Sequence, residues 1–215
     1  ELKSRGLGDV YKRQMKNIAF IGTSHIHTPN FISRVNSNNQ INCIGVWDKD
    51  KNRSKTDSEK LQCKNYDNYI DLLKEPNLDG VIVCSETNLH FELVKKITEN
   101  KKHCFIEKPL GIGKKDSFEM ANLIESSNII FQTGYFMRSN PVYIKLKELI
   151  TANYFGEISR IRLINCHDGI MRDIFKNYQW MTDPKVAGVG AFGDLGTHVL
   201  DLSLIHISEP TRLEL

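Results

Sequence analysis

The sequence predicts an α/β protein in which a doubly wound parallel sheet is followed by the beginning of an α+β domain. Short apolar runs alternate with stretches of helical spacing through residue 137. The runs are apolar along most of their length, as in parallel strands that helices cover on both faces. Beyond that point the pattern changes to a helix, an alternating strand and a glycine-rich turn.

The first part contains five apolar runs that predict strands, at residues 16–22, 41–48, 78–85, 103–109 and 129–136. Helices are expected between them at 30–37, 51–61, 66–76, 88–101 and 114–127. In 88–101, for example, Phe91, Val94 and Ile97 share one helical face. Ligands of such sheets bind beyond the carboxyl ends of the strands, so the residues at those ends are the candidates for a site.

The second part begins with a predicted helix at 141–150. Residues 156–168 alternate Ile158, Ile161 and Leu163 with polar residues, which predicts a half-buried strand. A glycine-rich turn and a helix are expected over 187–202.

The two ends look foreign, because residues 1–14 and 203–215 resemble translated sequencing-adapter sequence at the edges of metagenomic reads. A natural extension and a natural C-terminus are the alternative. With the first interpretation, the native part is a fragment with one domain at 15–137 and a truncated second domain at 138–202.

Composition narrows the class of protein. The formal net charge is +3 with scattered basic residues, which does not suggest a nucleic-acid surface. No apolar run reaches the roughly 20 residues that span a bilayer. Five cysteines without a C-x-x-C pair suggest reduced, buried thiols, and we therefore expect a cytoplasmic protein.

The loop after the first strand resembles a dinucleotide-binding turn with only one of its glycines. Gly22 holds the first position of G-x-G-x-x-G, while Ser24 and His27 replace the other two. Thr28 and Pro29 suggest a cap and a first helical position, so that the helix starts later and its N–H groups meet phosphates.

On this interpretation the cofactor contacts come from Gly22, Ser24, His25 and Ile26. A plain structural loop is the alternative. A metal site at His25 and His27 would need further ligands, and no specific set lies nearby in the sequence, so we expect no metal.

Asp48 ends the second strand, where a Rossmann domain places a carboxylate that accepts hydrogen bonds from the adenosine ribose. Such a carboxylate repels a 2′-phosphate and therefore favours NAD over NADP. Lys49 and Arg53 weaken this preference, since either is able to meet a phosphate.

Two further motifs carry chemistry. In "IEKPLG", Lys108 follows a buried strand and precedes a proline that favours an extended backbone. In "GDLGTH", Asp194 and His198 are four residues apart, which places them on one face of a helix. Alone, the latter pair is better interpreted as a helix-terminal acid and a packed histidine.

Together these motifs resemble the glucose–fructose oxidoreductase, inositol dehydrogenase and MocA family of nicotinamide-dependent dehydrogenases. The similar stretches run in family order, from "IAFIGTSHIH" and "VWDKD" through "KKHCFIEKPLG" to "GVGAFGDLGTHVLD". The resemblance implies an NAD(P)-binding Rossmann domain at 15–137 and a truncated substrate domain at 138–202.

The resemblance also implies residue roles. Lys108 contacts substrate and nicotinamide, Asp194 fixes the substrate, and His198 removes the hydroxyl proton. Residues implied near the cofactor are Ser85, Thr87, Asn88, His90, Glu107 and Lys108, although the proline of the family's T-P-N turn is absent. Arg138 and Trp180 are implied to border the substrate.

The expected activity is NAD(P)-dependent oxidation of a secondary alcohol on a sugar, cyclitol or related polyol, with NAD preferred to NADP. A non-catalytic NAD-binding regulator and a redox-assisted glycosidase on the same fold are the alternatives. The parent protein, rather than this fragment, is the expected enzyme, and a homo-oligomer through the C-terminal sheet is implied.

Overall fold

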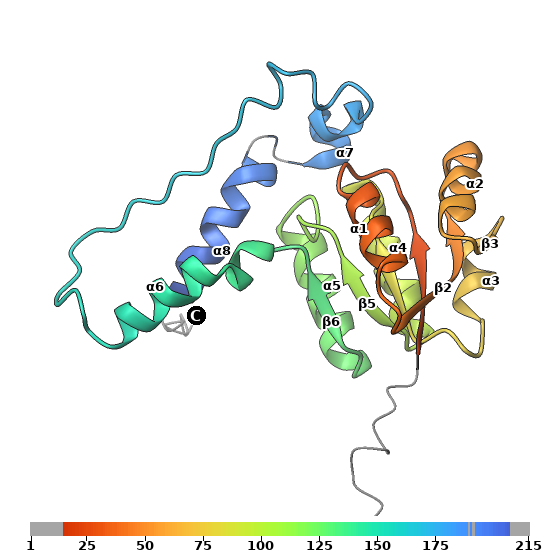
Figure 1. Cartoon of the computed structure of the whole chain (residues 1–215), viewed down its shortest axis with the longest axis horizontal. Coiled ribbons are helices and arrows are strands. Elements are labelled where there is room, and N and C mark those ends of the chain that lie inside the picture. Colours follow the sequence, from red (N-terminus) through yellow and green to blue (C-terminus); the bar gives the residue numbers. More distant parts are fainter. Residues whose placement is uncertain (1–14, 189, 191, 207–215) are drawn as a thin grey trace, which may run out of the picture.

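The computed structural model describes residues 15–188, 190 and 192–206. Its first part is a six-stranded sheet in the order β3-β2-β1-β4-β5-β6 (Figure 1), and neighbouring strands run parallel throughout it. The strands are β1 (Lys16–Ile21), β2 (Ile41–Trp47), β3 (Lys64–Asn65), β4 (Gly80–Val83), β5 (His103–Ile106) and β6 (Phe131–Thr133). The chain winds outward in both directions from the β1–β4 boundary, which confirms the predicted doubly wound sheet.

Helices cover this sheet on both faces: α1 (Thr28–Asn36), α2 (Lys51–Lys60), α3 (Tyr69–Leu73), α4 (His90–Glu99) and α5 (Lys114–Ser127). Side chains that alternate along β1 enter two separate cores. Phe20 packs with Ile32 of α1, whereas Ile21 belongs to the cluster that contains Ile97 of α4 and Met120 of α5. The sheet is therefore buried on both sides, as its apolar strands predict.

Two details differ from the sequence prediction. The edge strand β3 was not predicted, because it consists of two exposed polar residues whose only strand signal is their pairing with β2. The helix predicted at 66–76 begins only at Tyr69, since the Asn68 side chain accepts a hydrogen bond from Ile70 N–H and caps it there.

The second part contains two longer helices, α6 (Pro141–Thr151) and α8 (Thr197–His206), which lie side by side (Figure 1). A long connection between them carries the short turns η4 (Gln179–Thr182), α7 (Pro184–Ala187) and the π-helical turn η5 (Phe192–Gly196). The turn η3 (Phe136–Ser139) joins the sheet to α6.

The strand predicted at 156–168 is wrong: none of these residues is in a strand. Within the part of the chain that the structure describes, no strand pairs with them, and an alternating pattern forms a strand only when a partner supplies the hydrogen bonds. Consequently, Ile158 and Ile164 are exposed.

No helix within the described ranges is both long and apolar enough to cross a bilayer. The end segment at 1–14 and most of 203–215 lie outside the described residues; positions 203–206 complete α8. The domain boundaries stay predictions.

Candidate active site

The loop after β1 is pressed against the end of β4, and this contact requires glycine at position 22. Gly22 has a φ of +79°, and a Cβ added there would lie 2.4 Å from the Ser85 Cβ. Two backbone hydrogen bonds hold the loop, from Gly22 N–H to the Trp47 carbonyl and from Cys84 N–H to the Gly22 carbonyl. The loop therefore sits over the β1–β4 boundary, where the winding of the sheet reverses.

The same loop ends in a helix N-terminus with free donors. Helix α1 begins at Thr28, with His27 at the N-cap and Pro29 in the first turn. The capping role predicted for Thr28 is wrong, and His27 makes no side-chain cap either. Among the described residues, the backbone N–H groups of Ser24 and Ile26 have no hydrogen-bond partner. Free N–H groups before a helix form an anion-binding cradle, so this loop fits a pyrophosphate.

Asp48 lies at the predicted place, but its carboxylate is already engaged. It is 1% exposed, and one oxygen accepts from Thr23 N–H at 2.6 Å. The other accepts from Asp50 N–H at 2.7 Å and from the Arg53 guanidinium at 2.9 Å. A ribose contact at Asp48 therefore requires Arg53 to move, a requirement that the sequence did not indicate.

The segment that follows β4 lies at the same carboxyl end of the sheet as the loop after β1, because β1 and β4 are neighbouring parallel strands. Thr87 and Asn88 form a turn of 3₁₀ helix, in which Thr87 is buried. His90 begins α4, and its Nδ1 lies 3.1 and 3.0 Å from the carbonyls of Pro109 and Leu110. Because carbonyls only accept, Nδ1 carries the proton, and burial lowers the pKa of His90. His90 thus holds the loop after Lys108 in place.

Lys108 and Asp194, 86 residues apart in sequence, form the centre of the site. Lys108 is 3% exposed, and its Nζ lies 2.5 Å from Asp194 Oδ1 and 2.8 Å from the Asp194 carbonyl. His167 Nε2 approaches the other carboxylate oxygen at 3.3 Å. Burial alone would raise the pKa of Asp194, but Lys108 and His167 outweigh it and lower that pKa. His167 lies in no recognisable motif, so the sequence did not indicate its place here.

His198 is buried on α8 beside this pair. The rings of Tyr135 and Phe136 meet it edge-on, with centroids 5.6 and 5.2 Å away. Burial, then the charge of Lys108, lowers the pKa of His198, so the ring is neutral at pH 7. Its Nδ1 is buried without a hydrogen-bond partner in the described part of the chain. A neutral imidazole with a free nitrogen is suited to accept a proton.

The two residues expected at the substrate border have other contacts. Arg138 forms a two-pronged ion pair with Asp201, with Nε 3.1 Å from Oδ2, and so fastens α8 to η3. Trp180 donates from its indole nitrogen to the Ser24 carbonyl at 3.0 Å and stacks near His25. A substrate role for either residue stays a prediction.

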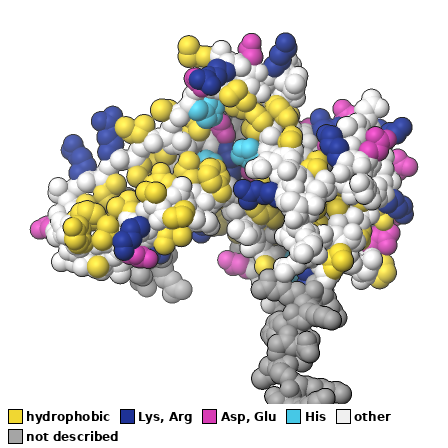
Figure 2. All heavy atoms as spheres, viewed as in Figure 1, with side chains coloured by type: hydrophobic (Ala, Val, Ile, Leu, Met, Phe, Trp, Pro, Cys, Tyr) yellow, Lys and Arg dark blue, Asp and Glu magenta, His cyan; other side chains and the backbone are white. Residues whose placement is uncertain are grey.

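A cavity of about 270 Å³ lies next to the Lys108–Asp194 pair. Asp194, His167 and Asp168 belong to its polar wall, and Ile170, Met171 and Phe175 form much of its apolar wall. Figure 2 shows histidine side chains at the junction of the two parts and many apolar side chains over the side that carries α6 and α8. The cavity thus adjoins a place where buried charged groups of both parts meet.

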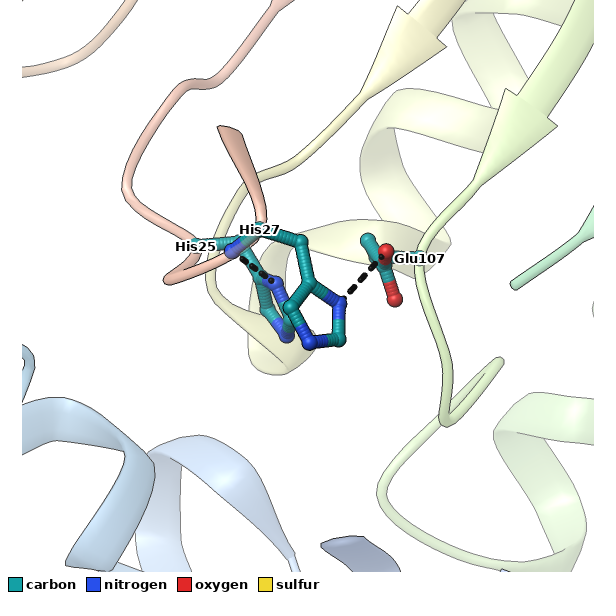
Figure 3. Close-up of side chains that lie close together, drawn as sticks. All are labelled: His25, His27 and Glu107. Carbon is teal, nitrogen blue, oxygen red and sulfur yellow. Dashed lines mark hydrogen bonds and ion pairs between the residues drawn. The ribbon is translucent and has the colours of Figure 1, made fainter. Parts of the chain in front are cut away.

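A third group of side chains surrounds His27 (Figure 3). His27 Nδ1 lies 3.0 Å from Glu107 Oε1, and His25 Nδ1 accepts a hydrogen bond from His27 N–H at 3.2 Å. The sequence indicated no further ligand for the two histidines, because Glu107 is 80 residues away along the chain. Its strand ends beside the β1 loop, and only the fold shows this.

A parallel sheet with an anion-binding turn at its switch point is a dinucleotide-binding domain of the Rossmann type. Residues 16–135 match the oxidoreductase family with an NAD-binding Rossmann fold (GFO/IDH/MocA), and residues 143–214 match the GFO/IDH/MocA C-terminal domain. The chain belongs to this family. The second match includes most of the tail that we expected to be foreign.

Several relatives are inositol dehydrogenases. Myo-inositol 2-dehydrogenase of Thermotoga maritima is 35% identical over 55% of this chain and 36% of its own length. The NAD⁺-dependent scyllo-inositol 2-dehydrogenase of Bacillus subtilis is 27% identical over 62% of this chain and 38% of its own. The crystal structure of scyllo-inositol dehydrogenase from Lactobacillus casei with NAD(H) and scyllo-inositol superposes with a TM-score of 0.73 at 19% identity, covering 89% and 56% of the two chains. The sequence matches thus span less than half the length of these two curated relatives.

Proposed function

We propose that the protein oxidises a secondary alcohol of a cyclitol, sugar or related polyol with NAD. The observation that carries this proposal is the ion pair of the buried Lys108 with the half-buried Asp194, beside a neutral His198 whose Nδ1 has no partner among the described residues. The relatives that are inositol dehydrogenases support the substrate class.

The roles follow from the charges. Lys108 holds the substrate oxygen and stabilises the negative charge that develops on it as the proton leaves. His198 takes that proton, since its lowered pKa keeps the ring unprotonated at pH 7. Asp194 holds the Lys108 ammonium through their ion pair and accepts a neighbouring hydroxyl of the substrate.

The chain's residues also fit the cofactor. Ser24 and Ile26 offer backbone N–H groups to the pyrophosphate, and Gly22 permits the close approach of the backbone. NAD, when bound, supplies the hydride acceptor for the carbon whose hydroxyl loses its proton to His198. The five free thiols are consistent with work in the cytoplasm, which we include in the proposal together with homo-oligomer formation.

The test is the formation of NADH by the complete gene product with a panel of inositols and monosaccharides. Lys108→Gln should lower turnover by about 100- to 1,000-fold, as when a donor to a developing oxyanion is lost. Lys101→Gln, at an exposed position seven residues earlier in the chain, is the control. If the protein binds NADH but oxidises none of these alcohols, it is a binding protein rather than a dehydrogenase.

The preference for NAD is tested on the 215-residue chain itself. Asp48 is buried at the position expected to meet the adenosine ribose, and the buried Glu86 shares Arg53 with it, so we expect NADH to bind at least about tenfold more tightly than NADPH. Tighter binding of NADPH would contradict this and assign Arg53 or Lys49 as the partner of a 2′-phosphate. NADPH binding to Arg53→Gln then distinguishes the two residues, because it weakens only if Arg53 is that partner.

A further inference from the structure

Three side chains outside the proposed acid–base group converge at the start of α1 (Figure 3). His25, His27 and Glu107 each place one potential ligand atom within 4.8 Å of the others. Two come from the β1 loop and the third from the end of β5, so the fold brings them together. Two histidines and one carboxylate are a common ligand set for Zn²⁺ and for non-haem Fe²⁺.

The chemical state of these groups suits a metal. Burial lowers the pKa of His25 to about 3, so this ring stays neutral. Burial opposes ionisation of Glu107, but the hydrogen bond from the His27 side chain favours it, and on balance the pKa of Glu107 is lowered. Metal ions bind the neutral imidazole and the ionised carboxylate, which are the forms that His25 and Glu107 take here.

Neighbouring groups hold the three side chains in place. His25 N–H donates to the Cys84 carbonyl at 2.9 Å, and Lys108 N–H donates to the second oxygen of Glu107 at 3.0 Å. The Lys108 ammonium is bound to Asp194 and is therefore not the partner of the Glu107 carboxylate. Outer contacts of this kind orient ligands at metal sites.

His27 occupies the third glycine position of the dinucleotide-binding pattern, where a small residue is expected. A histidine is larger than the pattern expects at this position. Its ring points to Glu107, with Nδ1 3.0 Å from Oε1. His27 is also the accessible member, with 42% of its side chain exposed against 2% for Glu107. An ion thus has a route to the group from the solvent side.

We infer that His25, His27 and Glu107 form a binding site for a divalent transition-metal ion of the Zn²⁺ class. Around a tetrahedral zinc ion, with bonds of about 2.0–2.2 Å, the ligand atoms lie about 3.3 Å apart. The observed spread of up to 4.8 Å therefore has to narrow by about 1.5 Å, from 4.8 to 3.3 Å, when an ion binds. The ion displaces the proton between His27 and Glu107, and three protein ligands leave a position for water or a ligand oxygen.

Metal binding is tested without reference to the dehydrogenase activity, because the probe is the metal alone. The 215-residue chain, without a histidine tag and with its thiols reduced, is dialysed against Zn²⁺ and its bound zinc is quantified. Titration with Co²⁺ reports the ligands through visible absorption. We expect one equivalent of tightly bound metal, and a rise in melting temperature with Zn²⁺ because the ion binds the folded chain.

His27→Ala and Glu107→Gln should each weaken Zn²⁺ binding by at least about tenfold and abolish the thermal shift. Cys63→Ser is the matched control, because Cys43 and Cys63 have their sulfur atoms 3.7 Å apart and are the competing place for a soft metal. Circular dichroism shows whether each variant is folded. Should one of them unfold, the Co²⁺ spectrum of the native chain still distinguishes thiolate from histidine and carboxylate ligands.

The inference is overturned if the native chain binds no stoichiometric metal, if the two ligand variants bind it as tightly as the native chain, or if Cys63→Ser loses it instead. Any of these outcomes leaves His27 and Glu107 as a hydrogen-bonded pair beside the phosphate loop. NADH binding, measured in parallel with a chelator present, distinguishes failure of the metal site from failure of the proposed function.

Discussion

The two parts of the molecule use their apolar residues in opposite ways. In the sheet part, Phe20, Ile21 and Ile97 have no exposed surface. In the second part, Val142 and Ile164 are 71% and 70% exposed. Nevertheless the second part supplies Asp194, His198 and Trp180, and these reach the edge of the sheet. The comparison teaches that stability resides in the first part, whereas the groups proposed to react depend on a few contacts between the two.

The sharpest test of this division is His198→Ala. If His198 is the base, its loss should lower turnover by about 100- to 10,000-fold while NADH binding to the sheet part is unchanged. Steady-state kinetics of the complete gene product and a separate NADH titration measure the two effects, with His103→Ala on β5 as the control. Turnover at the native rate would assign the proton to Lys108 or to a water.

Two isoleucine substitutions test whether the free energy of unfolding resides mainly in the sheet part. Ile97→Ala should lower the free energy of unfolding by about 2–5 kcal/mol, because it leaves a cavity in the core of the sheet part. Ile164→Ala should change it by less than about 0.5 kcal/mol, since that side chain already faces solvent. Urea unfolding of both variants compares them directly, and equal losses would show that the second part has a core of its own.

Acid should weaken the sheet part through His90. Its pKa is lowered by burial in the folded state, so below the ordinary value of 6.5 the unfolded chain takes up a proton that the folded chain does not. The free energy of unfolding should fall with decreasing pH by up to about 1.4 kcal/mol per unit for this group. His90→Asn, which keeps a donor for the Pro109 carbonyl, should flatten the slope by one proton relative to the native chain.

The smallest effect is expected at the contact between the parts. Trp180→Phe removes the hydrogen bond to Ser24 and should cost about 0.5–1.5 kcal/mol. Trp47→Phe removes a comparable bond to the Asp67 carbonyl within the sheet part. Hydrogen exchange distinguishes the two: Trp180→Phe should loosen the segment around η4 only, and Trp47→Phe the end of β2. Exchange that rises across the sheet in both variants would mean that the parts unfold together.

Much of the sheet was predictable because its signals are local. Five of the six strands lie within predominantly apolar runs of the sequence, and the helix from His90 to Glu99 shows its buried face in its spacing. The exception at 156–168 has an alternating pattern of the right kind but no partner strand beside it in the described residues. Periodicity reports which face a segment would bury, and the partner decides whether the strand forms.

The site was predictable where short motifs mark it and not where the fold assembles it. Lys108, Asp194 and His198 stand in recognisable motifs, and the structure brings them together. His167 and the Glu107–His27 contact have no local signal, because each partner is distant in the chain. Likewise, nothing in the sequence shows that Arg53 already covers Asp48.

The order of the elements along the chain also determines which part of the protein is synthesised first. Residues 16–133 contain all six strands of the described sheet, together with the turn proposed to bind the cofactor's phosphates, and they are made before the ribosome reaches Asp194 and His198. Domains fold as units during synthesis, the N-terminal one first. The cofactor platform is therefore able to assemble, and to bind NAD, while the proposed acid–base groups have yet to be translated. During that interval, the growing polypeptide has the cofactor site but lacks Asp194 and His198, the groups proposed to act on the substrate.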